Sequence, residues 1–417
     1  MNSQKPIINI VFIGHVDAGK STIAGQILCQ LGLIDPRTLQ KYIDESAALN
    51  RGSWYLSWAL DKNEEERERG KTVEVGRAAF ELPDRRVNIL DAPGHKLYVA
   101  DMIDGANQAD VAVLVVSART NEFEAGFEKG GQTREHVLLA RTGKINRLVV
   151  LVNKMDTVNW SQTRFQDIQK RLTEYLKKLY KDTPVSFIPI SGFQGINIKD
   201  KSKDISWYTG ESFLEYLNKL EIDRDYNSPF IISITEKIKA LGNTYLTGRM
   251  ECGAIHTSDE VKILPKGINT TCLLYDEDEN EIEKAYAGEI IKLKFKDVEL
   301  DVGDMVCHPC NTELKVCTEF TCTLNILETK NIISPGYSCI LHLRMMAKPC
   351  KIVEFRNVVN GKVVKKHFVR KGEQVMAKIR CDTPIVLVET KDKSRIDRFS
   401  LRDEGMTVGI GIVRRII

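Results

Sequence analysis

Short apolar runs and amphipathic segments alternate through the first half of the chain. An apolar run at 7–13 leads directly into a glycine-containing turn, and from Ser21 to Leu33 the apolar residues recur at helical spacing. Helical patterns at Gln132 to Thr142 and Ser161 to Tyr180 separate most of the later strand-like runs. Those runs lie at Val87 to Leu90, Val111 to Val116, Leu148 to Val152 and Phe187 to Ile190. This alternation predicts a mostly parallel sheet covered on both faces.

The pattern changes near Asp223 to Pro229. Beyond it come short alternating runs with turn sequences such as Gly242-Asn243, and no long helical pattern. Such a segment is typical of one or two β-barrels. A second boundary is expected at His308 to Glu313, where a loop gives way to the alternating run from Lys315 to Leu327. We therefore predict an α/β domain over 1–226 and two all-β barrel domains over 227–312 and 313–417.

Composition narrows the class of protein only modestly. The 417 residues exceed what one core accommodates, and the formal charge is +3. This balance argues against a purely electrostatic nucleic-acid binder, although a local basic face can coexist with a balanced total. The ten cysteines show no paired framework, and we find neither a signal peptide nor an apolar run that could span a bilayer. A reducing cytoplasm is the expected compartment, with no membrane partner.

The turn after the first apolar run matches the phosphate-binding pattern G-x-x-x-x-G-K-[ST]. Backbone N–H groups of such a loop converge on the β-phosphate, and the following helix N-terminus favours negative charge. Lys20 is expected to neutralise the β- and γ-phosphates, and Ser21 is expected to bind Mg²⁺ through its hydroxyl. The candidate nucleotide-binding residues here are Gly14, His15, Val16, Asp17, Ala18, Gly19, Lys20, Ser21 and Thr22.

Two further segments predict the magnesium and γ-phosphate contacts. Asp91-Ala92-Pro93-Gly94 follows the strand at 87–90, so Asp91 can hold Mg²⁺ through water and Gly94 can offer its N–H to the γ-phosphate. Thr72 is the candidate switch residue, whose hydroxyl would reach Mg²⁺ and whose N–H would reach the γ-phosphate. A strand-edge threonine without such a role is the alternative. The predicted metal set is Ser21, Thr72 and, through water, Asp91.

The base-binding loops come later in the chain. Asn153-Lys154-Met155-Asp156 follows the strand at 148–152, and a carboxylate there can accept hydrogen bonds from the guanine N1–H and amine, which adenine lacks. Ser191-Gly192-Phe193, after the strand at 187–190, fits the last base-contacting loop. Ligands of open α/β sheets bind beyond the carboxyl ends of the strands. The expected ligands are therefore GTP and GDP, and the expected fold is an α/β P-loop GTPase domain followed by two all-β barrels.

Several segments resemble a known family. Gly14-His-Val-Asp-Ala-Gly-Lys and Asp91-Ala-Pro-Gly-His95 resemble the elongation-factor superfamily of translational GTPases. The segments 51–61, 70–76 and 123–136 resemble the eukaryotic class-II peptide-chain release factor, which works with the stop-codon-reading class-I factor. The stretch from Arg398 to Gly405 resembles the last barrel of that family.

The resemblance implies a function in translation termination. It implies that His95 positions the attacking water, that Asp17 helps to bind a monovalent cation, and that hydrolysis on the ribosome promotes peptide release. It also places the class-I release factor on the third domain, with docking candidates Arg398, Phe399, Arg402 and Asp403. Lys71 departs from the apolar gate residue usual in elongation factors. Members of the family often begin with a long extension that contacts poly(A)-binding protein, whereas this sequence reaches its phosphate-binding loop by residue 14, so that contact is not expected from this chain.

Three other functions are alternatives to termination. An aminoacyl-tRNA carrier, a ribosome-rescue GTPase and a metabolic GTPase that regulates sulfate activation would share the phosphate-binding loop. The segments 54–58 and 126–131 favour termination over the first two, and ribosome-stimulated hydrolysis would exclude the third.

A zinc module is the remaining alternative. Cys307-x-x-Cys310 is followed by Cys317 and Cys322, but there is no second C-x-x-C and no histidine pair at finger spacing. Strand alternation predicts that Cys317 and Cys322 point to opposite faces. Buried core thiols, and no zinc, are expected.

Overall fold

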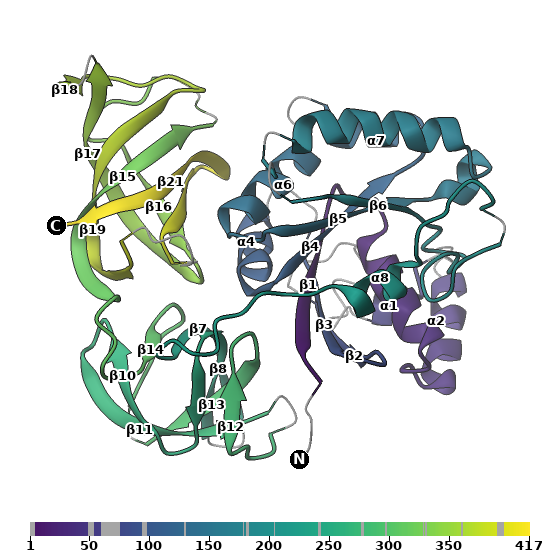
Figure 1. The fold of residues 1–417 in the computed structure, drawn as a ribbon, viewed down its shortest axis with the longest axis horizontal. Coiled ribbons are helices and arrows are strands. Elements are labelled where there is room, and N and C mark those ends of the chain that lie inside the picture. Colours follow the sequence, from purple (N-terminus) through teal and green to yellow (C-terminus); the bar gives the residue numbers. More distant parts are fainter. Residues whose placement is uncertain are drawn as a thin grey trace. The chain divides into compact units, whose positions relative to one another are not determined.

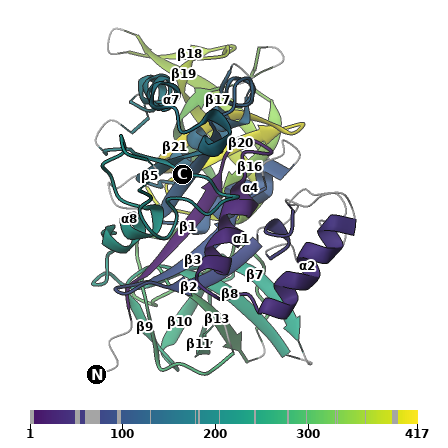
Figure 2. The ribbon, with the colours of Figure 1, turned by 90° about the vertical axis from the view of Figure 1, so that its right-hand side faces the viewer.

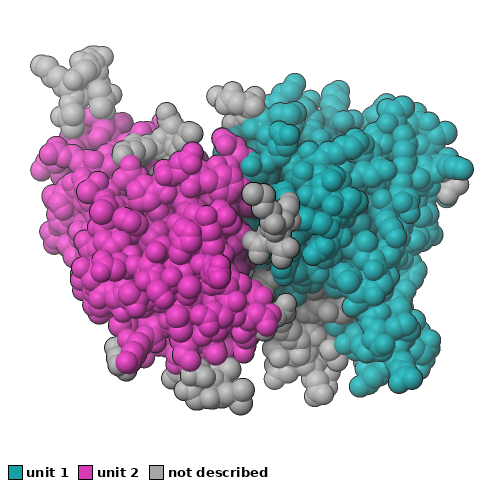
Figure 3. All heavy atoms as spheres, turned by 60° about the horizontal axis from the view of Figure 1, so that its bottom comes forward, with its two compact units in different colours: residues 1–141, 145–222 teal, residues 142–144, 223–417 magenta. Residues whose placement is uncertain are grey.

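The computed structural model describes most of the chain in two compact units, 1–141 with 145–222, and 142–144 with 223–417 (Figure 3). The described residues are 5–48, 54–59, 76–93, 98–128, 131–177, 179–180, 183–203, 205–240, 243–276, 279–296, 298–327, 329, 332–359, 362–389 and 396–417.

A six-stranded sheet organises the first unit, in the order β2-β3-β1-β4-β5-β6. All neighbours run parallel except β2 and β3, which are antiparallel. The strands are β1 (Ile7–Ile13), β2 (Gly76–Glu81), β3 (Arg86–Asp91), β4 (Val111–Ser117), β5 (Arg147–Asn153) and β6 (Ser186–Pro189). The mostly parallel sheet predicted from the sequence is thereby confirmed.

Both faces of this sheet are covered, because alternate residues of the central strands are apolar on either side. Val11 and Leu114 belong to the core under one group of helices, and Phe12 and Val113 to the core under the other. In Figure 1, α6 and α7 lie above the sheet and α1 and α8 below it. The helices are α1 (Lys20–Gln30), α2 (Pro36–Ala48), α4 (Val99–Gln108), α5 (Glu122–Phe127), α6 (Gln132–Thr142), α7 (Gln162–Leu176) and α8 (Phe213–Lys219), with short 3-10 turns η1 (Ser57–Ala59) and η3 (Met155–Val158).

The second unit begins with a closed antiparallel barrel in the order β10-β11-β13-β8-β7-β14. Its strands are β7 (Ile231–Ala240), β8 (Asn243–Cys252), β10 (Glu260–Leu264), β11 (Ile268–Tyr275), β13 (Ile290–Phe295) and β14 (Met305–Cys307). β9 (Ala254–His256) and β12 (Lys284–Tyr286) form a separate antiparallel pair.

A second barrel follows, in the order β16-β20-β21-β15-β19-β17-β18, and pairing of β16 with β17 closes the ring. Its strands are β15 (Lys315–Ile326), β16 (Ser338–Leu343), β17 (Met346–Val359), β18 (Lys362–Lys366), β19 (Gln374–Leu387), β20 (Arg398–Asp403) and β21 (Met406–Ile416). The predicted architecture of one α/β domain and two barrels is confirmed. Figure 2 shows α1 of the first unit running along β1 and β3.

The two barrels share an apolar cluster within the second unit. Met305 and Cys307 at the end of the first barrel pack with Val386 and Val388 of the second. Nearby, the buried carboxylate of Glu251 on β8 forms ion pairs with Arg249, at 3.7 Å, and with Arg344 between β16 and β17. An apolar contact and a buried ion pair of this kind join the barrels side to side.

One expectation about the second barrel was wrong. Cys317 and Cys322 lie five residues apart, yet both are buried on the inner face of β15. The register against β19 shifts between Cys317 and Glu319, so a bulge adds a residue and returns both thiols to the interior.

No helix in the described part of the chain is both long and apolar enough to cross a membrane.

Asp104 on α4 gives a prediction about stability and pH. Burial, and then the charge of Asp101, raise the pKa of the Asp104 carboxyl from 3.8 to about 7. The folded state therefore favours the protonated form, and ionisation costs stability increasingly as pH rises from about 4 to about 7, after which the cost is constant. Asp104→Asn is expected to stabilise the protein by on the order of 1–3 kcal/mol near pH 8, and by much less near pH 5.

Thermal unfolding at the two pH values measures this gain. Asp44→Asn on the exposed side of α2 is the matched control and is expected to change stability little at either pH. An Asp104→Asn gain of equal size at both pH values would show that its ionisation is not the cause.

Candidate functional site

Residues 14–19 connect β1 to α1 in a conformation that requires glycine at both ends. Gly14 has φ of 144° and Gly19 has φ of 96°, values that other residues rarely adopt. A Cβ on Gly14 would lie 2.3 Å from the Val115 carbonyl oxygen, and one on Gly19 would lie 2.3 Å from Nδ2 of Asn153. The loop therefore wraps closely between β4 and the end of β5.

Lys20 lies beneath this loop as the first residue of α1. Its buried Nζ donates hydrogen bonds to the carbonyl oxygens of Gly14, at 3.2 Å, and His15, at 3.1 Å. Burial lowers the pKa of Lys20, and the charges of Asp91 and Asp17 oppose that shift. One ammonium group and two carboxylates are thus gathered at the loop, and the hydroxyl of Ser21 follows in the first turn of α1.

Two side chains of α6 hold the loop from behind. The Gly14 N–H donates to Nδ1 of His136 at 3.1 Å, and the Val16 N–H donates to Oε1 of Gln132 at 3.5 Å. His136 is fully buried, and this burial, followed by the charges of Lys20 and His15, lowers its pKa to about 3. The imidazole is therefore neutral at physiological pH, as an acceptor at Nδ1 requires.

Sequence reasoning did not identify these two residues as part of the site. Gln132 and His136 occur in the segment 123–136, which was used only for its family resemblance. Nothing in their spacing indicates that they reach a loop more than 110 residues earlier.

Asn153 joins three loops through one buried amide. Its Nδ2 donates to the Ala18 carbonyl at 2.8 Å, and its Oδ1 accepts the N–H groups of Lys154 and Gly192, each at 2.8 Å. The phosphate-type loop, the segment 153–156 and the segment 191–193 therefore meet at this side chain. The structure brings together what the sequence predicted as separate motifs.

The segment after Asn153 presents Asp156 at the edge of these loops. Lys154 has a left-handed backbone with φ of 62°, and Nζ of this residue forms an ion pair with Glu122 at 2.8 Å. Met155 is buried and donates its N–H to the Ile190 carbonyl at 3.2 Å. Asp156 is partly exposed in η3, and the Phe193 ring is 51% exposed. A carboxylate and an aromatic ring are thus accessible to a planar ligand on this side.

The short helix α5 is held between the site and α7. A Cβ on Gly126 would lie 3.0 Å from Cβ of His15, so α5 packs directly against the first loop. Glu124 binds Arg164 at 3.0 Å and Arg171 at 3.2 Å on α7. α5 therefore supports the loop.

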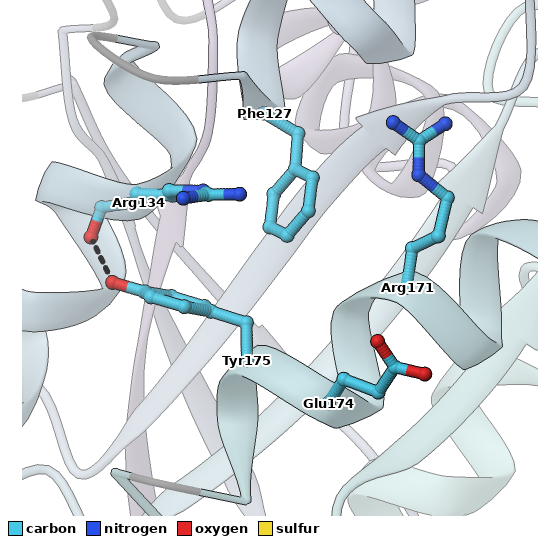
Figure 4. Close-up of a pocket in the computed structure, with 5 residues that line it drawn as sticks. All are labelled: Phe127, Arg134, Arg171, Glu174 and Tyr175. Atoms are coloured by element: carbon cyan, nitrogen blue, oxygen red, sulfur yellow. Dashed lines mark hydrogen bonds between the residues drawn. The ribbon is translucent and has the colours of Figure 1, made fainter.

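A shallow pocket of about 320 Å³ opens beside α5 (Figure 4). The Arg134 guanidinium lies 4.4 Å from the centre of the Phe127 ring and 5.3 Å from that of Tyr175, whose hydroxyl donates to the Arg134 carbonyl at 3.1 Å. Arg171 and Glu174 complete its lining. Cation–π packing accounts for these contacts, and we assign the pocket no catalytic role.

The remaining predicted residues either lie at the end of β3 or fall outside the described part of the chain. Thr72, Gly94, His95 and Lys71 lie outside the described residues. Asp91, Ala92 and Pro93 are buried at the carboxyl end of β3, beside β1.

The four docking candidates on the second barrel do not all lie at its surface. The Phe399 side chain is only 1% exposed, and its ring packs against Phe320 at 5.4 Å between centres. Arg402 is buried and donates to the Gly405 carbonyl at 3.1 Å. Strand alternation explains Phe399, which faces the barrel core. Of the predicted four, Arg398 and Asp403 keep partial exposure.

Two family descriptions match this chain. Residues 5–238 match the elongation factor Tu GTP binding domain, and residues 313–417 match the elongation factor Tu C-terminal domain.

Curated relatives extend the likeness along the chain. The eukaryotic peptide chain release factor GTP-binding subunit of Candida maltosa is 42% identical over 99% of this chain and 60% of its own length. Its counterpart in Schizosaccharomyces pombe is 43% identical over 99% of this chain and 64% of its own length. The chain thus spans about three fifths of the length of these relatives.

A solved structure shares the fold. The GTPase-like domain of S. cerevisiae Ski7, bound to GTP, has a TM-score of 0.78 at 19% identity and covers 98% of this chain and 97% of its own.

Proposed function

The chain belongs to the family of the elongation factor Tu GTP binding domain, and from this premise we propose that it is a GTPase of translation termination. It would bind GTP and Mg²⁺, carry the class-I release factor to a ribosome halted at a stop codon, and hydrolyse GTP there to promote peptide release. The cytoplasm is the proposed compartment. The observation that carries the proposal is the junction at Asn153, which joins the loop that holds the Lys20 ammonium to the segments 153–156 and 191–193.

We propose that backbone N–H groups and the Lys20 ammonium bind the phosphates. The N–H groups of Gly14 and Val16 are engaged by α6, so they hold the loop and do not face the ligand. The first turn of α1, which begins at Lys20, carries the positive end of the helix dipole and directs backbone N–H groups out of the helix. Phosphate oxygens would accept from these groups and from Lys20, whose Nζ would exchange its carbonyl partners for the β- and γ-phosphates.

The residues at the loop fit a magnesium ion. Ser21 offers a hydroxyl and Asp91 a buried carboxylate, both of which are hard oxygen donors suited to Mg²⁺. When bound, the ion would neutralise charge on the phosphate oxygens. We propose Thr72 as the third magnesium residue and Asp17 as a contact of a monovalent cation. Asp156 would select guanine by accepting from its N1–H and amine.

Hydrolysis is proposed to depend on His95, which would orient the attacking water next to the γ-phosphate. In this proposal Thr72 and Gly94 bind the γ-phosphate through their N–H groups. Loss of the γ-phosphate then releases the two segments that contain these residues. The ribosome would complete the arrangement, because isolated switch GTPases hydrolyse GTP slowly. The class-I factor would be held by the second barrel.

Steady-state GTP hydrolysis tests the proposal, measured with the protein alone, with ribosomes, with a class-I factor and with both. We expect slow turnover alone and about a thousandfold stimulation with both partners. His95→Ala is expected to keep nucleotide affinity and lose the stimulated rate. If ribosomes and class-I factor together leave the rate unchanged, the termination role is wrong; if no guanine nucleotide binds, the GTPase assignment fails as well.

A further inference from the structure

A short strand forms one edge of the sheet in the first unit. β6 is the last strand in the sheet order and, among the strands that the structure describes, it pairs with β5 alone, in parallel from Ser186 to Pro189. Figure 1 shows β6 beyond β5, with α7 above it and α8 below it. Backbone groups on the outer side of β6 therefore take no part in the sheet.

Phe187 directs its backbone groups to this outer side. The Ile190 N–H donates to the Val152 carbonyl of β5 at 2.9 Å, so the backbone of Ile190 faces β5. Because successive residues of a strand face opposite sides, Phe187 and Pro189 face outward. The Pro189 carbonyl already accepts from Nδ2 of Asn197 at 2.9 Å. Within the described part of the chain, neither the N–H nor the carbonyl of Phe187 has a hydrogen-bond partner. This residue thus offers one donor and one acceptor to another chain.

The edge lacks the charged side chains that usually protect an unpaired strand. β6 has the sequence SFIP, whereas β2, at the opposite edge of the same sheet, carries Arg77 and Glu81. Pro184 and Pro189 limit the edge on either side, because proline has no N–H to donate. An uncharged edge of this kind is a place where another chain can pair, and the two prolines restrict pairing to the residues between them.

A groove of about 670 Å³ lies at this edge. Residues of α7, the segment 185–188, the segment 207–211 and one residue of α8 line it. Its volume is twice the 320 Å³ of the pocket beside α5 and is within the range of about 300–1,000 Å³ that is usual for ligand sites. The unpaired backbone of Phe187 therefore borders a space that is large enough for a segment of polypeptide.

An aromatic ring lies on each side of the edge. Trp207 packs with the core under α7, where its ring centre is 5.1 Å from that of Phe165 and its Nε1 donates to the Trp160 carbonyl at 2.8 Å. Tyr208 packs with the core under α8, and its hydroxyl donates to the Glu211 carbonyl at 3.1 Å. Side chains of a strand added to β6 would point alternately to these two sides, so apolar side chains there would contact the two rings.

The groove is close to neutral. Gln162, Gln166 and Gln169 of α7 contribute amides that both donate and accept hydrogen bonds, as peptide groups require. Among the described lining residues the one charged side chain is Glu211, which is paired with Lys219 at 2.5 Å. A nucleic acid would need cations for its phosphates, and a charged peptide would find no opposite charge. The lining therefore favours an uncharged polypeptide.

We propose that β6 and this groove form a docking site for an extended, uncharged peptide segment of a partner protein, which would add a strand to the sheet. The segment would accept from the Phe187 N–H and donate to the Phe187 carbonyl. Its apolar side chains would contact Trp207 on one side and Tyr208 on the other. In this mode of recognition, backbone pairing provides affinity and the side-chain contacts provide specificity.

Phe187→Pro, with Phe187→Val as the matched control, separates pairing from stability. Both substitutions remove the ring, but only proline removes the outward N–H, which is not bonded to β5. Both variants are expected to unfold at similar temperatures, below that of the parent. Only Phe187→Pro should lose a further factor of about ten or more in peptide affinity, because an acceptor of the bound peptide is then left unpaired.

The probe is a phage-displayed library of random peptides of about eight residues. The most enriched sequence is made as a fluorescein-labelled peptide and titrated with the full chain without nucleotide, followed by anisotropy. Two further versions carry N-methyl groups on alternate backbone nitrogens and need no variant of the protein. Since alternate residues of a paired strand face β6, one version should bind about tenfold or more weakly than the other.

The position of the bound peptide is measured separately. With 5-fluorotryptophan in the protein, the ¹⁹F resonance of Trp207, assigned from Trp207→Phe, should shift when the peptide saturates the chain. The resonance of Trp58, which is buried near α1, should not shift. A shift at Trp58 without one at Trp207 would show that the peptide binds elsewhere.

Three other outcomes would also overturn the proposal. The library could yield no enriched sequence, or Phe187→Pro could bind the peptide as tightly as Phe187→Val. Alternatively, both methylated peptides could bind as well as the unmodified one, which would indicate that the protein holds side chains alone. GTP takes no part in these measurements, so their result is independent of the proposed function.

Discussion

Asn153→Ala is expected to weaken guanine-nucleotide binding by about a hundredfold or more and to destabilise the first unit by about 3 kcal/mol. The substitution removes one donor and one acceptor that together satisfy the Ala18 carbonyl and the N–H groups of Lys154 and Gly192. Asn153 is 3% exposed, so water cannot readily replace it, and each unsatisfied buried group costs about 1–3 kcal/mol. Titration with a fluorescent GDP analogue and thermal unfolding measure the two effects.

Asn153→Asp provides the graded comparison. A carboxylate can still accept from the N–H groups of Lys154 and Gly192 but cannot donate to the Ala18 carbonyl. Its loss of stability should lie between those of the parent and the alanine variant. If both substitutions leave nucleotide affinity unchanged, the three loops do not act through this amide.

Gly25→Ala is expected to release the segment 54–59 from α1. A Cβ at Gly25 would lie 1.8 Å from the Leu56 carbonyl oxygen, a backbone atom that cannot turn aside. Leu56 and Trp58 are 1% and 2% exposed, so one of the packed surfaces must separate. An overlap of this depth costs about 3 kcal/mol, enough to undock most molecules.

Trp58 reports on this change directly. With 5-fluorotryptophan in all four tryptophans, the ¹⁹F resonance of Trp58, assigned from Trp58→Phe, should move to the position of a solvent-exposed indole. Gly32→Ala is the matched control, because a Cβ there meets no atom within 4 Å and only its left-handed backbone, with φ of 70°, is strained. An unmoved Trp58 resonance in Gly25→Ala would contradict tight docking of 54–59.

The sequence was sufficient where function and fold use the same local pattern. The apolar run ending at Ile13, the glycines at 14 and 19 and the helix from Lys20 predicted both a loop and its chemistry, because positive φ and close backbone contact need glycine. The mostly parallel sheet followed because β4 and β5 are continuous buried runs.

Contacts between residues that are far apart in the sequence could not be predicted from local patterns. His136 accepts a hydrogen bond from the Gly14 N–H because α6 packs under the loop. No local sequence pattern indicates that these two residues meet. Asn153 was predicted to contact the nucleotide, but the role of its amide in joining three loops depends on how β1, β5 and β6 end together at one edge of the sheet.

Face assignments in the second barrel failed for a different reason. A single bulge between Cys317 and Glu319 reversed the predicted direction of one thiol, because side chains in strands alternate with a period of two. Phe399 was predicted as a docking candidate from a family resemblance, whereas alternation along β20 directs its side chain inward. A resemblance in sequence identifies a strand but not the side of it that a partner would meet.

The joint between the barrels has a mechanical consequence. With Met305 and Cys307 packed on Val386 and Val388, and Glu251 clamped by two arginines, neither barrel can rotate without breaking both an apolar seam and a buried charge cluster. The two barrels are therefore expected to move as one body, so that a displacement of one displaces the other.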